Sequence, residues 1–150
     1  MIITEKNGFT ITTDKSSINL DRLHDFLANK SYWAQNIPKD IVKKSIDNSL
    51  NFSILNSNDQ FVGFARLVTD YATFAYLADV YIEPEVRGIG LSKWLMETIN
   101  NYPLVKELRS LVLFTKDAQE LYRKFGWKEL ADPSRCMVIR RDPIELYGKK

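Results

Sequence analysis

One loop in the sequence has residue types and spacing that suit phosphate binding. Its six residues run Arg87-Gly88-Ile89-Gly90-Leu91-Ser92 and lie between a predicted strand and a predicted helix. Two glycines let a ligand approach the backbone closely, because no side chain stands in the way. The first turn of a helix leaves N–H groups unpaired and carries a partial positive charge, which suits a phosphate. Arg87 adds a cation that can pair with phosphate oxygens.

Three interpretations of this loop involve a nucleotide-containing ligand, and two of them fit poorly. A nucleotide P-loop ends in Gly-Lys-Ser/Thr, whereas this loop ends in Gly90-Leu91-Ser92. A dinucleotide fingerprint needs a small residue at position 93, where Lys93 stands. The loop resembles the pyrophosphate-binding segment Arg/Gln-x-x-Gly-x-Gly/Ala of the GNAT superfamily of N-acetyltransferases, with Arg87 first, Gly90 fourth and Ser92 last. An ordinary strand–turn–helix without a ligand is the alternative.

A second segment resembles the same superfamily. GNAT enzymes carry Asn-x-x-Ala-x-x-x-Tyr-x-x-x-Gly-Phe after the central helix and one further strand. This sequence has the matching residues Thr115, Ala118, Tyr122, Gly126 and Trp127, with threonine for the asparagine and tryptophan for the phenylalanine. The two segments occur in the order typical of the family. The chain therefore resembles small bacterial GNAT proteins, most clearly over residues 61–127.

The resemblance implies an α/β (α+β) fold with a mixed, mostly antiparallel sheet, splayed at an acetyl-CoA site and flanked by helices. The pantetheine arm of acetyl-CoA would pair with backbone groups of Val80, Tyr81 and Ile82. The pyrophosphate would bind the backbone amides of residues 87–93. The hydroxyl of Thr115 would bond a pantetheine amide.

The resemblance also implies direct transfer of the acetyl group to an amine, which needs two proton-handling groups. Tyr122 suits the leaving thiolate, because a phenol of pKa about 10 can donate to a thiolate whose conjugate acid has a pKa of about 8.5. A core tyrosine is the alternative. For the base, Asp79 interrupts an apolar strand, and Glu83 at its end could act through water. Asp79 is equally open to a structural role with a backbone or arginine partner.

The surrounding pattern predicts one domain, residues 1–150, without linkers or repeats. Apolar runs predict strands at residues 9–13, 51–55, 61–68, 76–82, 111–114 (buried on both faces), 127–130 and 136–140. Helical spacing predicts helices around residues 20–27, 38–46, 91–102 and 118–125. Pro103 should end the third helix, whereas Asp117 should cap the fourth and Gly126 should end it.

The sequence defines the residues that would bind the amine acceptor less clearly. Tyr32 and Trp33 lie between the first two helices, where they could form a wall of the acceptor site or only pack the core edge. Asp70 and Tyr71 precede the central strand and could contact a cationic acceptor. His24 flanks the apolar face of the first helix and is interpreted as structural.

Composition narrows the class of protein. The chain is 45% hydrophobic, which suffices for one domain with a core, and its net charge of +2 gives no support for nucleic-acid binding. No apolar run approaches the roughly 20 residues that span a bilayer, and the first residues do not resemble a secretion signal. One cysteine and one histidine exclude an internal disulfide and the usual zinc site. The prediction is a cytoplasmic protein without a metal.

Together these features predict an acetyl-CoA-dependent N-acetyltransferase. A GNAT-fold module that binds or senses acyl-CoA without turnover is the alternative, and a domain that only docks another protein is the third. The intact Tyr122 favours the enzyme. Polyamines, amino acids, antibiotics and protein N-termini all stay open as acceptors, and a homodimer stays open as the oligomeric state.

Overall fold

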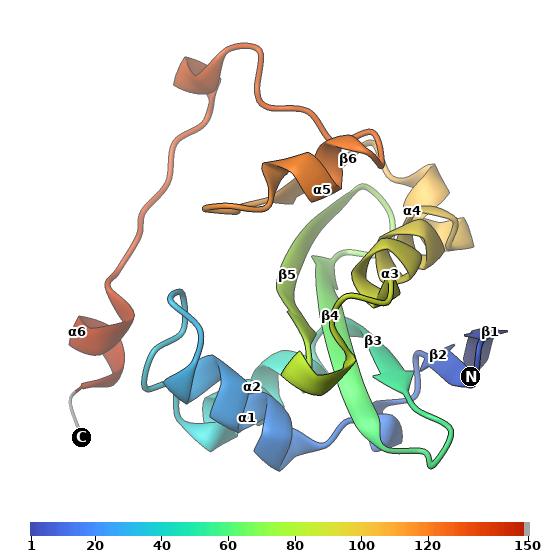
Figure 1. Ribbon diagram of the computed structural model, residues 1–150. Coiled ribbons are helices and arrows are strands. Elements are labelled where there is room, and N and C mark those ends of the chain that lie inside the picture. The colour runs from blue at the N-terminus through green and yellow to red at the C-terminus, as the bar shows by residue number, and fades with distance from the viewer. Residues whose placement is uncertain (149–150) are drawn as a thin grey trace.

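The computed structural model describes residues 1–148, whose six strands form one sheet in the order in which they occur along the chain (Figure 1). Neighbouring strands are antiparallel except β5 and β6, which run parallel. The strands are β1 (Ile2–Lys6), β2 (Phe9–Thr12), β3 (Leu50–Leu55), β4 (Phe61–Thr69), β5 (Phe74–Ile82) and β6 (Ser110–Leu113).

Helices cover both faces of the sheet, so the core has two parts. On one face, α1 (Leu20–Asn29) and α2 (Lys39–Asp47) pack their apolar sides on residues such as Phe64 and Tyr81. On the other, α3 (Leu91–Asn100) packs with Leu67 and Leu77, and the short α4 (Pro103–Glu107) follows it. The remaining helices are α5 (Gln119–Arg123) and α6 (Pro143–Tyr147). None of the helices within residues 1–148 is long and apolar enough to cross a bilayer.

A β-bulge changes the course of β5. The register shifts between Phe64 and Arg66 of β4, so that Asp79 and Val80 together face one residue of β4. Asp79 has a φ of 56°, a left-handed conformation that aspartate adopts more easily than most residues. Bulges bend a strand and increase its twist. Strand β6 is the neighbour of β5 on the side away from β4. The bend lies at the position where β6 ends.

The sheet is splayed between β5 and β6, as the sequence predicted. Their parallel ladder runs from Phe74 opposite Ser110 to Leu77 opposite Leu113 and stops there. Residues 78–82 of β5 continue without a strand on that side among the described residues. This leaves an open backbone edge that leads directly to the glycine loop and α3.

Most predicted elements are present. The helix predicted at residues 91–102 is present as α3 and ends two residues early, at Asn100. Strand β1 and helices α4 and α6 were not predicted. The prediction that the strand at residues 111–114 is buried on both faces was wrong. All four residues of β6 are half-buried and Phe114 is exposed, since β6 is an edge strand.

The predicted strands at residues 127–130 and 136–140 are absent. Residues 128–142 form an extended segment with one 3₁₀ turn, Pro133–Arg135, and Figure 1 shows this segment standing away from the sheet before α6. The prediction failed because β-branched and apolar residues form a strand only where another strand offers hydrogen bonds. Within residues 1–148 no strand does so for this segment.

Candidate functional site

The glycine loop and the first turn of α3 present a row of free backbone donors. Gly88 and Gly90 have φ of 85° and 87°, and a Cβ at either position would meet no atom within 4 Å. The N–H of Trp94 donates to the carbonyl of Gly90 at 3.0 Å, which is the first bond of the helix. The N–H groups of residues 91–93 therefore have no helical acceptor, and no side chain caps them. Open space, three donors and the helix dipole fit a pyrophosphate.

Arg87 is fixed beside this row. Its Nε donates to the carbonyl of Ile82 at 2.9 Å, across the single 3₁₀ turn that joins β5 to the loop. The side chain is exposed, and its terminal N–H groups stay available to an anion. The hydrogen bond therefore fixes Arg87 at the end of β5, and the guanidinium still adds positive charge at the loop.

The open edge of β5 includes the three residues predicted to bind pantetheine. Val80 and Ile82 are half-buried against the α3 side of the core, whereas Tyr81 is buried on the opposite face. The ring of Tyr81 stacks on Phe26 of α1, with ring centroids 4.1 Å apart. Both faces of the strand are therefore anchored by packing, and its free edge is the part left for a ligand.

Thr115 begins the turn that carries Tyr122. Its Oγ1 accepts a hydrogen bond from the N–H of Ala118 at 3.0 Å, whereas no side chain caps α5, so the prediction that Asp117 caps this helix was wrong. The hydroxyl proton of Thr115 stays available as a donor. At the other end, Gly126 has a φ of 89°, which suits its predicted role in ending the helix.

Tyr122 lies in the core with its hydroxyl unpaired. The residue is 8% exposed, its ring lies edge-on to Trp127 with centroids 6.1 Å apart, and no described residue bonds its hydroxyl. Burial, with a smaller contribution from the nearby Tyr32, raises the pKa of Tyr122 to about 12. The phenol therefore stays protonated near neutral pH and can act as a hydrogen-bond donor.

Asp79 is held by two partners. Its Oδ2 accepts from Arg66 Nε at 2.6 Å and its Oδ1 accepts from Trp33 Nε1 at 2.8 Å. Arg66 in turn donates through Nη1 to Ser49 Oγ at 3.0 Å. Both carboxylate oxygens are engaged, which supports the structural alternative for Asp79 over the catalytic one.

Glu83 is also buried, but its single ion-pair partner at hydrogen-bonding distance is half-exposed. Arg22 Nη1 of α1 donates to its Oε1 at 3.0 Å, and the backbone N–H of Glu83 donates to Val62 at 2.8 Å. Burial raises the pKa of Tyr81 well above its ordinary value, and the neighbouring Glu83 carboxylate adds to this shift. A buried carboxylate thus lies at the end of the open edge of β5.

Two pairs of aromatic side chains come from the α1–α2 loop, from β5 and from the residue after β6. The rings of Tyr32 and Trp33 lie 5.0 Å apart, and those of Tyr76 and Phe114 lie 5.6 Å apart. The N–H of Lys116 donates to the Tyr32 hydroxyl at 3.0 Å, which ties the α1–α2 loop to the loop after β6. Figure 1 shows the α1–α2 loop rising beside β5. We call Tyr32, Trp33, Tyr76 and Phe114 the aromatic wall.

Other predicted residues lie away from the opening. Asp70 and Tyr71 are at the far end of β5, where Asp70 accepts bonds from the backbone of Ala72 and Thr73. Hydrogen bonds from Thr73 hold the pKa of the Asp70 carboxyl well below its usual range. His24 Nε2 contacts the carbonyl of Ile37 at 2.9 Å, which fits the structural role expected of it.

Several residues of the site were not found from the sequence. They are Arg22, Arg66, Tyr76 and Phe114. An arginine in the middle of the apolar run at residues 61–68 was the one available signal, because a buried strand rarely carries an unpaired charge. Within residues 1–148 no group of three Asp, Glu, His or Cys side chains is placed to hold a metal.

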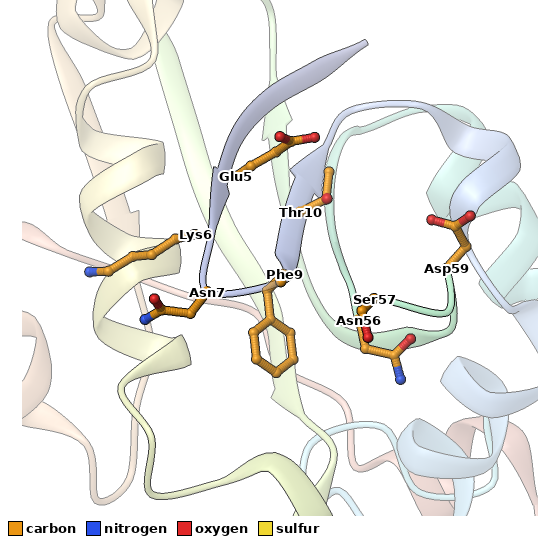
Figure 2. Close-up of a pocket in the computed structure, with 9 residues that line it drawn as sticks. Glu5, Lys6, Asn7, Phe9, Thr10, Asn56, Ser57 and Asp59 are labelled. Atoms are coloured by element: carbon orange, nitrogen blue, oxygen red, sulfur yellow. The ribbon is translucent and has the colours of Figure 1, made fainter.

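A separate shallow hollow lies at the other edge of the sheet. Figure 2 shows it between the β1–β2 turn and the β3–β4 turn, lined by residues such as Lys6, Phe9 and Asn56. Polar groups do not converge there, and the hollow is far along the sheet from β5. The residues that line this hollow therefore suggest neither a reaction nor a bound ligand.

The open strand edge leads into the glycine loop and then into α3, and a match to a known protein family covers all three. Residues 48–129 match the acetyltransferase (GNAT) domain, so the chain belongs to the GNAT acetyltransferases.

Individual relatives agree with this assignment. A crystallised protein of Xanthomonas campestris pv. campestris, assigned to the GNAT family, aligns with 97% of this chain and 100% of its own at 36% identity and a TM-score of 0.90. An uncharacterized N-acetyltransferase of Porphyra purpurea is 30% identical over 81% of this chain and 70% of its own. A structure from Deinococcus radiodurans, at 17% identity and a TM-score of 0.72 over 100% of this chain and 99% of its own, shares the fold.

Proposed function

We propose that this chain is an acetyl-CoA-dependent N-acetyltransferase that passes the acetyl group directly to an amine. The observation that carries the proposal is the continuity of the open edge of β5 with the free N–H groups of residues 91–93. A ligand with an extended, amide-bearing arm and a pyrophosphate matches both parts at once. Acetyl-CoA has both, and it supplies the acetyl group as a thioester.

Acetyl-CoA, the acetyl donor, would be held mainly by backbone groups of the protein. Val80, Tyr81 and Ile82 offer peptide groups along the edge, and the amides from Arg87 onward receive the pyrophosphate. The guanidinium of Arg87 would add charge, and the hydroxyl of Thr115, which has its proton free, would bond a pantetheine amide. Because these hydrogen-bonding groups belong to the backbone of packed elements, their positions are fixed before the ligand binds.

Two side chains would handle protons. Glu83 is proposed as the base, acting through a water molecule, because its carboxylate is buried and has one half-exposed partner. Tyr122 is proposed as the donor to the departing sulfur, since a pKa of about 12 keeps its proton on the phenol oxygen. Asp79 is proposed to position Trp33 and Arg66, with both of its oxygens engaged. The presence of Tyr122 favours turnover over acyl-CoA sensing.

The aromatic wall would select the acceptor. Tyr32, Trp33 and Phe114 are all exposed, and exposed aromatic faces in one cluster favour a partner with apolar or aromatic surface. The carboxylate among them, Asp79, is neutralised by Arg66, so it offers little attraction to a polycation. We therefore expect an amine attached to an apolar or aromatic group to be accepted better than a polyamine.

Three measurements test this function. Calorimetry should show binding of acetyl-CoA and much weaker binding of ATP and NAD, and acetyl-CoA should slow hydrogen exchange at residues 80–82. Release of CoA should then be faster with phenethylamine than with spermidine. Equal binding of ATP, or exchange at residues 80–82 that acetyl-CoA leaves unchanged, would contradict the donor site. Faster turnover of spermidine would contradict the acceptor class alone.

A further inference from the structure

The α1–α2 loop is bonded to both of the chain segments that diverge at the opening of the sheet. Just beyond the end of the β5–β6 ladder, on the β5 side, Asp79 Oδ1 accepts a hydrogen bond from Trp33 Nε1 at 2.8 Å. On the β6 side, the N–H of Lys116 donates to the hydroxyl of Tyr32 at 3.0 Å. Two neighbouring residues of one loop, Tyr32 and Trp33, therefore bridge the place where the strands separate.

This loop is held on α1, so it can act as a fixed support. The N–H of Asn36 donates to the carbonyl of Ala28 at 3.0 Å. The ring of Trp33 lies edge-on to Phe26 of α1, with ring centroids 5.8 Å apart. Figure 1 shows the loop rising from α1 and α2 on the face of the sheet opposite α3. Because the loop is tied to a packed helix, the position of Tyr32 is set before any ligand binds.

The segment that carries Tyr122 is tied to remote elements at both of its ends. At the C-terminal end, Asn100 Nδ2 of α3 donates to the carbonyl of Phe125 at 2.7 Å. At the N-terminal end, the N–H of Lys116 has no backbone acceptor within residues 1–148, and the Tyr32 hydroxyl is its partner. The ammonium of Lys116 also lies 5.5 Å from the centre of the Tyr32 ring. Asn100 and Tyr32 therefore hold the two ends of this segment.

Tyr122 lies between these two ties. Its N–H donates to the carbonyl of Ala118 at 3.4 Å, so its helix starts directly after the turn that contains Lys116. Side chains on a helix lean towards its N-terminal end, which is the end that Tyr32 holds. Burial is the main cause of the raised pKa of Tyr122, and the smaller contribution of Tyr32 reflects how near the two phenols lie. A shift of this turn would therefore move the Tyr122 hydroxyl.

We propose that Tyr32 is a positioning residue for Tyr122. By accepting the N–H of Lys116, Tyr32 fixes the turn that sets where the Tyr122 phenol meets the departing sulfur. This role rests on the proposed function, in which Tyr122 is the donor to that sulfur. A displacement of about 1 Å can cost about 10²-fold in rate, so one hydrogen bond outside the reacting groups is enough to matter. Tyr32 would then support the proton donor in addition to its proposed contact with the acceptor.

Tyr32→Phe tests this role, because phenylalanine keeps the ring and loses only the oxygen that accepts the hydrogen bond. The Lys116 amide should exchange faster with deuterium in this variant. Its kcat should fall about tenfold, within the range that a small displacement causes. Affinity for acetyl-CoA, measured by calorimetry, should not change. Tyr71→Phe is the matched control, because Tyr71 is exposed and lies at the far end of β5, and it should leave kcat and the exchange of Lys116 unchanged.

The double variant Tyr32→Phe/Tyr122→Phe separates positioning from a general loss of stability. If Tyr32 acts through Tyr122, adding Tyr32→Phe to Tyr122→Phe should lower kcat no further. A further loss as large as that of Tyr32→Phe alone would overturn the proposal, because Tyr32 would then act independently of Tyr122.

Other results would also overturn the proposal. Exchange of the Lys116 amide that is the same in Tyr32→Phe as in the wild type would mean that the hydrogen bond does not hold the turn. Wild-type kcat in Tyr32→Phe, in a protein that turns over, would remove this role and leave the proposed function standing. A wild-type protein that releases no CoA with any amine would remove the proposed function, and this role with it.

Discussion

The proposed donor side and the proposed acceptor side of the opening are built in different ways. On the donor side, residues 80–93 follow one another along the chain and act mainly through backbone groups of a strand, a loop and a helix. On the acceptor side, Tyr32, Arg66, Asp79 and Phe114 come from four separate segments and act through side chains. A backbone site tolerates sequence change as long as the glycines keep their conformation. A side-chain site changes with each substitution, so the acceptor side is where this chain can differ from its relatives.

Tyr122 is the proposed donor to the leaving sulfur, and its substitution should have the largest effect. Tyr122→Phe removes the donor to the leaving sulfur, so kcat and kcat/KM should fall together by about 10²–10⁴-fold. Affinity for acetyl-CoA should not change, and the melting temperature should hold, since the ring still packs on Trp127. Because the pKa of Tyr122 is about 12, the wild-type rate should not fall from loss of this proton up to about pH 10. A loss of only about tenfold would make Tyr122 a positioning residue.

Glu83→Gln tests the proton acceptor at the end of β5. The amide cannot take a proton from the amine, so kcat should fall by about 10²-fold or more, within the range of a general base. Glu85→Gln is the matched control, because Glu85 is exposed and two residues away. Steady-state kinetics at saturating acetyl-CoA measure both variants. Equal turnover in the wild-type protein and in Glu83→Gln would remove Glu83 from the mechanism.

Asp79→Asn should damage the acceptor side and spare the donor side. Arg66 is 16% exposed at its side chain, so the loss of its partner should lower the free energy of unfolding by about 3 kcal/mol. Asp47→Asn breaks an exposed pair with Lys43 and should cost under about 1 kcal/mol. Urea unfolding and acetyl-CoA calorimetry separate the two effects. A stable Asp79→Asn protein with abolished turnover would instead make Asp79 the base.

Gly90→Val should damage the donor side alone. Valine avoids the left-handed conformation, so the loop must shift and move the N–H groups of α3, and acetyl-CoA should bind about tenfold more weakly. Gly8→Val places the same strain in the β1–β2 turn, remote from the opening, and should leave affinity unchanged. Calorimetry on both variants distinguishes the site from general strain. Unchanged affinity in a folded Gly90→Val protein would contradict the loop as the pyrophosphate site.

Two of the wrong predictions have different physical causes. The segment at residues 136–140 has the composition of a strand, yet strand formation depends on an edge that sequence alone does not assign to it. Asp117 has the residue type of a cap, but Thr115 was the residue that the turn brought within reach of the Ala118 amide.

The sequence by itself determined the order of the central elements, the glycine loop before α3 and the segment from Thr115 to Trp127. These depend on neighbours a few residues apart, so spacing and residue type suffice to predict them. Only the tertiary structure decided that Asp79 meets Arg66 and Trp33, that Glu83 meets Arg22 and that Tyr32 meets Lys116. It also decided that β6 stops opposite Leu77 and leaves β5 open. Sheet register and helix packing bring these groups together, and both depend on the whole chain.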